Sequence, residues 1–148
     1  MSTIFKAACV QTNTGPDPDE GMKTVADAVR RARDAGADFI TTPENVLMIE
    51  SRRAAVLDKA EDEADHRGLQ SFRDLARETG AWLLAGSLTV KVEPERVANR
   101  SVLFDPQGAV VASYDKMHMF DVDLAGGESY RESRTYRPGD GAVIASLP

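Results

Sequence analysis

Cysteine and histidine are scarce in this sequence. It has one cysteine, Cys9, and two histidines, His66 and His118. A single thiol cannot form an internal disulfide, and these three residues follow no common zinc-ligand spacing, so we expect no cofactor. Cys9 lies within an apolar, strand-like run, where a thiol is ordinarily buried, protonated and inert. We therefore do not expect Cys9 to be a nucleophile, and we assign the histidines structural roles.

Concentrated positive charge is also absent. The chain has 24 acidic and 18 basic residues, a net charge of −6, and no run of basic residues. It therefore lacks the electrostatic attraction on which nucleic-acid and anionic-membrane binding depend. No segment approaches the length of a membrane-spanning helix or follows the pattern of a secretory leader. We expect a cytoplasmic protein with neither nucleic acid nor membrane as its partner.

The remaining composition is that of an ordinary folded domain. Hydrophobic residues make up 42% and charged residues 28% of the 148 positions, which suits one domain with a sizeable core. Apolar residues recur at helical spacing from Asp19 to Ala35 and from Gly68 to Thr79, each followed by a glycine that favours a helix end. A further helix is expected from Ser51, as its N-cap, through Ala64.

Short apolar runs predict strands around these helices. Residues 4–11 and 38–42 form two of them, and the sequences AWLLAGSLTV, RVANRSVLF and AVVASYD form three more, with a last strand expected at 142–147. Asp105 to Gly108 has the residue preferences of a type I turn. The order of elements predicts an α/β fold with antiparallel pairs in its sheet.

Two charged residues stand where a strand is expected to end. Glu44 follows Pro43 after the second strand, where rigid placement and partial burial are expected to raise its pKa toward that of a general base. Lys116 ends a later strand and precedes the apolar Met117. A carboxylate near a helix end and a lysine beside Asp115 are the structural alternatives. From Lys116 to Gly141 the sequence has no period, which is typical of a functional loop.

One segment resembles a calcium-binding loop. With Asp121 as the first position, Asp123 is the third, Gly126 the sixth and Glu132 the twelfth. Ala125 stands where an oxygen ligand is required, and proline and glycine occupy the place of the exiting helix. The calcium-binding module is therefore the least favoured function.

An ordered set of motifs connects the chain to a known family. The strand KAACVQ, the TPE after the second strand, NRSVLFDPQG, YDKMHMFDVDL and GESYRES occur in this order over nearly the whole length. Together they resemble the nitrilase, or carbon-nitrogen hydrolase, superfamily, and HMFDVD is most similar to its Nit amidase branch. The resemblance implies an α-β-β-α sandwich that pairs with a second copy, and small amides as substrates.

The same resemblance implies roles for particular residues. Members of the family use a cysteine, two glutamates and a lysine, and Glu44 and Lys116 match the first glutamate and the lysine. The second glutamate falls on Glu132, with Glu128 as the alternative. The nucleophilic cysteine of the family follows the strand that begins near Ala142, and this chain has no cysteine there.

We therefore expect residues 1–148 to be the N-terminal portion of a single carbon-nitrogen hydrolase domain, truncated before its nucleophile. Alone it is expected to be inactive, and to need a complementing C-terminal segment or a second copy. The alternative is a non-catalytic remnant that binds small amides or assembles with a partner.

Overall fold

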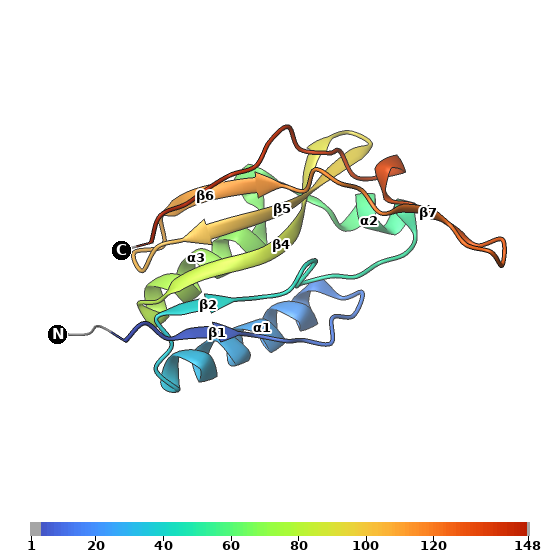
Figure 1. The fold of residues 1–148 in the computed structure, drawn as a ribbon. Helices are drawn as coiled ribbons and strands as arrows, with labels where there is room; N and C mark the ends of the chain where they lie inside the picture. Colours follow the sequence, from blue (N-terminus) through green and yellow to red (C-terminus); the bar gives the residue numbers. More distant parts are fainter. Residues whose placement is uncertain (1–3, 148) are drawn as a thin grey trace.

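The computed structural model describes residues 4–147 and shows an α/β fold (Figure 1). Helices, strands and two 3₁₀ turns alternate along the chain. In order they are β1 (Ala7–Cys9), α1 (Pro18–Asp34), β2 (Phe39–Thr41), α2 (Arg53–Lys59), β3 (Glu61–Asp62), η1 (Glu63–Asp65), α3 (Arg67–Thr79), β4 (Trp82–Glu93), β5 (Arg96–Phe104), β6 (Val110–Asp115), β7 (Asp121–Asp123), β8 (Ser129–Arg131) and η2 (Glu132–Arg134).

The main sheet has six strands in the order β1-β2-β4-β5-β6, with β3 pairing beside β4. The first three strands of this order are parallel, whereas β4, β5 and β6 are antiparallel. β7 and β8 form a separate hairpin that projects from the body (Figure 1). The expected α/β fold with antiparallel pairs is confirmed.

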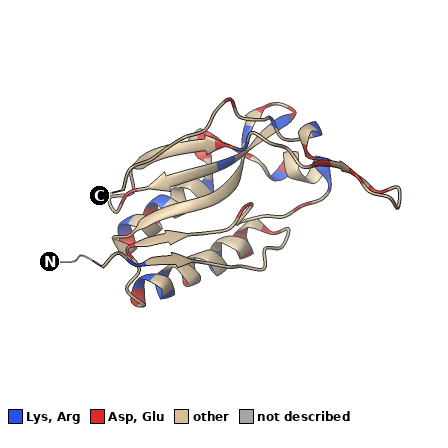
Figure 2. Ribbon diagram, in the orientation of Figure 1, with Lys and Arg blue, Asp and Glu red and all other residues tan. Residues whose placement is uncertain are grey.

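The core lies between the sheet and the helices α1 and α3. Its fully buried side chains come from both helices and from the central strands; among them are Val25, Val29, Phe72, Ile40, Leu83 and Phe104. Charged residues gather on the helices and the hairpin, while the strands carry few (Figure 2). In the part of the chain that the structure describes, no helix has the length and apolar character needed to cross a membrane.

The two strongest helix predictions are confirmed. Asp17 caps α1 by accepting hydrogen bonds from the backbone N–H groups of Asp19 and Glu20. Gly80 ends α3 in the left-handed conformation, with φ of 60°, which a glycine adopts without a steric penalty. The turn at Asp105 is also as expected, since Gly108 N donates to Asp105 O at 2.8 Å.

The helix predicted from Ser51 through Ala64 is shorter than expected. It begins at Arg53 after an uncapped Arg52, so Ser51 is not its cap. It stops at Lys59 because Glu61 and Asp62 are extended and pair with Val90 and Lys91 of β4. Tertiary pairing with a long neighbouring strand outweighs the local helical pattern here.

Two strand expectations are corrected. Cys9 is exposed, because successive side chains of β1 point to opposite faces of the sheet and Ala8 is the residue that packs on the core. Residues 142–147 form no strand. Every second side chain of this segment, at Val143, Ala145 and Leu147, nevertheless lines a cavity together with Leu84 of β4. Their apolar alternation is that of a strand, but no neighbour among the described residues pairs with their backbone.

Candidate active site

A tight loop after β2 positions Glu44. Asn45 has a positive φ of 47°, uncommon for a residue other than glycine, and its N–H donates to Ser87 Oγ at 2.8 Å. Ser87 N donates in turn to Pro43 O at 3.2 Å. A Cβ atom on Gly86 would lie 1.9 Å from Thr42 O, so the loop needs a glycine at this point of β4. These contacts hold Glu44 directly beside the central strand.

Lys116 follows β6 and is fixed through its backbone. Its N–H donates to Asn99 O at 2.9 Å, and its carbonyl accepts from Gly139 N at 2.9 Å. Its ammonium Nζ lies 2.9 Å from Glu44 Oε1 and 3.0 Å from Glu132 Oε2. The fold therefore brings together three residues that are 72 and 16 positions apart along the chain.

Glu132 joins this cluster to the base of the hairpin. Its Oε2 accepts a hydrogen bond from Phe120 N at 2.6 Å, and its backbone N–H donates to Phe120 O at 3.2 Å. Its side chain is only 14% exposed. Glu128, the alternative second glutamate, lies at the exposed hairpin turn, where Leu124 N donates to its carbonyl. Of the two glutamates, Glu132 is the one that contacts Lys116.

The electrostatics of the cluster differ from the sequence expectation. The hydrogen bond from Lys116, supported by one from Asn99, outweighs the opposing effect of partial burial and lowers the pKa of Glu44. The expected rise in the pKa of Glu44 was therefore wrong. Burial by itself lowers the pKa of Lys116, but the hydrogen bonds and charges of Glu44 and Glu132 together outweigh it and raise that pKa. A carboxylate beside a protonated amine is the resulting state at neutral pH.

The cluster opens into a cavity of about 350 Å³. Glu44, Lys116 and Glu132 line it together with the aromatic residues Phe120, Tyr130 and Tyr136. Burial raises the pKa of the Tyr136 phenol, which keeps it neutral. This volume is at the lower end of the range for small-molecule sites. The site thus offers an anionic proton acceptor and a cationic hydrogen-bond donor to a small ligand.

Sequence reasoning missed Asn99. This residue of β5 is 3% exposed, and its Nδ2 donates to Glu44 Oε1 at 2.7 Å. An asparagine directly after the apolar Val97 and Ala98 of this strand was the available signal, since a buried amide needs hydrogen-bond partners. Its partner could not be identified, because Glu44 is 55 residues away in the sequence.

Cys9 and His118 do not line this cavity. In the segment that resembles a calcium-binding loop, the carboxylates of Asp121 and Asp123 already accept hydrogen bonds from other residues of the protein. Both Asp123 oxygens accept from Arg131 Nη2 at 2.6 Å, and Asp121 accepts from the backbone and hydroxyl of Ser133. Among residues 4–147, no three His, Cys, Asp or Glu side chains are grouped as metal ligands would be.

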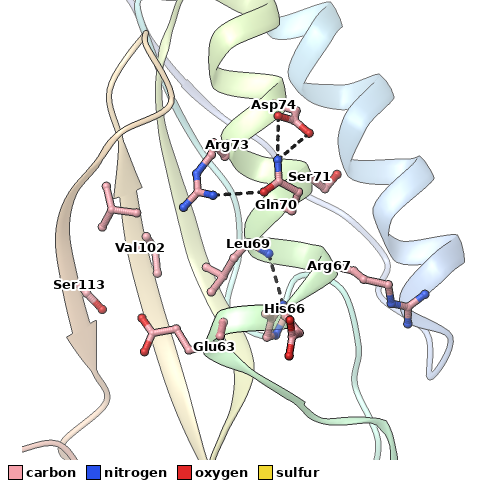
Figure 3. Close-up of a pocket in the computed structure, with 13 residues that line it drawn as sticks. Glu63, His66, Arg67, Leu69, Gln70, Ser71, Arg73, Asp74, Val102 and Ser113 are labelled. Carbon is pink, nitrogen blue, oxygen red and sulfur yellow. Dashed lines mark hydrogen bonds between the residues drawn. The ribbon is translucent and has the colours of Figure 1, made fainter.

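A larger cavity, of about 660 Å³, lies elsewhere, where side chains of α3 and η1 face Val102 and Ser113 of the sheet (Figure 3). His66 lines it, but Nδ1 of this ring accepts from Leu69 N and Nε2 lies 3.1 Å from Thr89 O. These contacts cap α3 and tie it to β4, which is a structural role. The cavity contains none of the three clustered residues, so its size alone does not make it the active site.

Comparison with known proteins places this chain in a family. The family model described as carbon-nitrogen hydrolase matches residues 6–147. Deaminated glutathione amidase of Yersinia enterocolitica is 33% identical over 95% of this chain and 50% of its own length. Human omega-amidase NIT2 is 25% identical over 99% of this chain and 52% of its own length. The chain therefore spans about half the length of these curated relatives.

A solved structure agrees with these sequence relatives. The crystal structure of an amidase from Nesterenkonia sp. superposes with a TM-score of 0.78 and 25% identity, over 96% of this chain and 51% of that one. The family model covers nearly every described residue, and Nit-type amidases are among the relatives. This chain belongs to the carbon-nitrogen hydrolase family, within its nitrilase-type fold.

Proposed function

We propose that Glu44, Lys116 and Glu132 are the acid–base and electrostatic residues of an amide-hydrolysing site. The observation that carries the proposal is the position of Lys116 Nζ, 2.9 Å from Glu44 and 3.0 Å from Glu132 beside the cavity. Residues 1–148 are then the N-terminal portion of a single hydrolase domain. Its nucleophile is a thiol from a cysteine outside this sequence, because Cys9 does not line the cavity.

The chemistry follows from the charges. The thiol proton passes to Glu44 as sulfur attacks the amide carbon, and the oxygen that becomes negative accepts a hydrogen bond from the Lys116 ammonium. Glu44 then delivers the proton to the departing nitrogen, which leaves as ammonia or an amine. Water attacks the thioester with Glu44 again as the base, and the acid and the free thiol are released. Glu132 holds Lys116 in place throughout.

A small amide is the proposed substrate class. Two of the relatives are named deaminated glutathione amidase and omega-amidase, and a mutant of the Nesterenkonia amidase shows the result of Michael addition of acrylamide at the active-site cysteine. The cavity of about 350 Å³ suits a ligand of that size. We propose that a complementing C-terminal segment or a second copy completes its walls. A cytoplasmic location stays a prediction.

The test begins with the gene. Its reading frame is followed past codon 148, the longer product is purified, and ammonia release from small linear amides is measured. Glu44→Gln and Lys116→Ala are each expected to lower turnover by about 100-fold or more. Glu128→Gln is the matched control, because this glutamate lies at the exposed hairpin turn, and its turnover should be unchanged.

Two results would overturn the catalytic proposal. One is turnover that stays unchanged in both Glu44→Gln and Lys116→Ala. The other is a frame without a cysteine-bearing continuation, which would favour the non-catalytic alternative, a protein that binds small amides or assembles with a partner.

A further inference from the structure

The two oxygens of Glu44 have unequal surroundings. Oε1 accepts hydrogen bonds from Asn99 Nδ2 at 2.7 Å and from Lys116 Nζ at 2.9 Å. Among residues 4–147, no hydrogen bond is formed to Oε2. The side chain is 56% exposed and lines the cavity, so Oε2 keeps its lone pairs available to a ligand.

Asn99 is placed to impose this asymmetry. It is 3% exposed in β5, opposite Thr89 of β4, so water has little access to replace its amide. A carboxylate only accepts hydrogen bonds, which fixes the amide with Nδ2 toward Glu44. Asn99 O meanwhile accepts from Lys116 N at 2.9 Å. One buried residue therefore contacts both members of the glutamate–lysine pair, through its side chain and its backbone.

We infer that Asn99 is a positioning residue that fixes the Glu44 carboxylate through Oε1 and so makes Oε2 the oxygen that carries the proton. This inference rests on the proposed function and deepens it. In the proposed reaction the thiol proton binds to Oε2 as sulfur attacks, and the same O–H bond breaks when the proton moves to the departing nitrogen. Lys116 alone would not fix the plane of the carboxylate, because a single donor allows rotation about the remaining bonds.

The Asn99 amide stabilises the ionised form of Glu44. A hydrogen bond to a carboxylate stabilises the charged state, so losing Asn99 Nδ2 favours the protonated form of Glu44. It also frees the side chain to turn out of the cavity. A residue that merely filled space in β5 would change neither the titration of Glu44 nor the position of its side chain.

The first test uses the longer product, with ¹³C-labelled glutamate and NMR titration of the Glu44 carboxyl carbon, assigned with Glu44→Gln. In Asn99→Ala the Glu44 titration midpoint is expected to move to higher pH. Asn99→Thr keeps a strand-favouring residue whose hydroxyl is too short for the contact, and it should show the same shift if the alanine variant fails to fold. Ser101→Ala is the control, because this neighbour in β5 bonds Gly86 O instead. An unmoved midpoint in a folded Asn99 variant would overturn the inference.

A kinetic test separates this inference from the proposed function. In the longer product, Asn99→Ala is expected to lower kcat by about 10- to 100-fold while KM changes little, because misplacing a catalytic group affects the chemical step. Unchanged kcat in a folded variant would contradict the positioning role. If the wild-type product hydrolyses no amide, the proposed function fails, whereas the NMR titration still shows whether Asn99 holds Glu44.

Discussion

Replacing Lys116 by alanine tests the physical basis of the site. The substitution removes the ammonium that lies between Glu44 and Glu132 and leaves two carboxylates facing one cavity. The Glu132 side chain is 14% exposed, so its lost charge-assisted bond costs about 2 kcal/mol. Glu44 is 56% exposed, and water compensates most of its loss, which adds about 0.5 kcal/mol.

The expected result is a free energy of unfolding lowered by about 2 to 3 kcal/mol at neutral pH. For a chain of this size that corresponds to a melting temperature about 4–10 °C lower. The measurement is thermal unfolding followed by circular dichroism. Lys23→Ala is the matched control, since Lys23 is an exposed lysine in α1, and its melting temperature should change little.

The pH dependence gives the decisive comparison. The folded state lowers the pKa of Glu44 below its ordinary value of 4.5, so the stabilisation is present above that pH and is lost as the pH falls through the folded-state pKa. The folded state raises the pKa of Lys116 above 10.5, so the stabilisation is present below that pH and is lost as the pH rises through the folded value. The difference between wild type and Lys116→Ala should therefore shrink at both extremes. An equal difference at pH 7 and pH 3 would refute the ion-pair account.

Three further predictions concern other parts of the fold. Gly86→Ala should destabilise the protein by about 3 kcal/mol in urea unfolding, because its Cβ would lie 1.9 Å from Thr42 O, while Gly141→Ala, with open space around it, should be nearly neutral. Asp115→Ala should cost about 3 kcal/mol, because it breaks a pair with Arg100 in which both side chains are under 20% exposed, whereas Glu63→Ala, at 63% exposed, should cost under about 1 kcal/mol. Comparable losses for Asp115→Ala and Glu63→Ala would contradict this reasoning. Millimolar calcium should leave the melting temperature unchanged, since a ligand that binds only the folded state must raise it, and a rise would revive the calcium-loop interpretation.

Much of the fold was predictable because its signals are local. The apolar periodicity of α1 and α3, the glycine after α3 and the Asp105 turn depend on residues within a few positions of one another. The helix that includes residues 60–64 was predicted wrongly, because pairing of Glu61 with Val90 of β4 is a long-range effect that no local pattern reports.

The candidate site shows the same division. The sequence by itself indicated that Glu44 and Lys116 lie where strands end, just after β2 and β6, and family motifs singled out Glu132. Only the tertiary structure decided that one ammonium contacts both carboxylates, that Asn99 binds Glu44, and that the pKa of Glu44 is therefore lowered. A carboxyl pKa depends on charges within a few ångströms, and residues 55 and 72 positions apart reach that distance only when the sheet assembles. Exposure of Cys9 was likewise decided by which face of β1 packs on the helices, and that face carries Ala8.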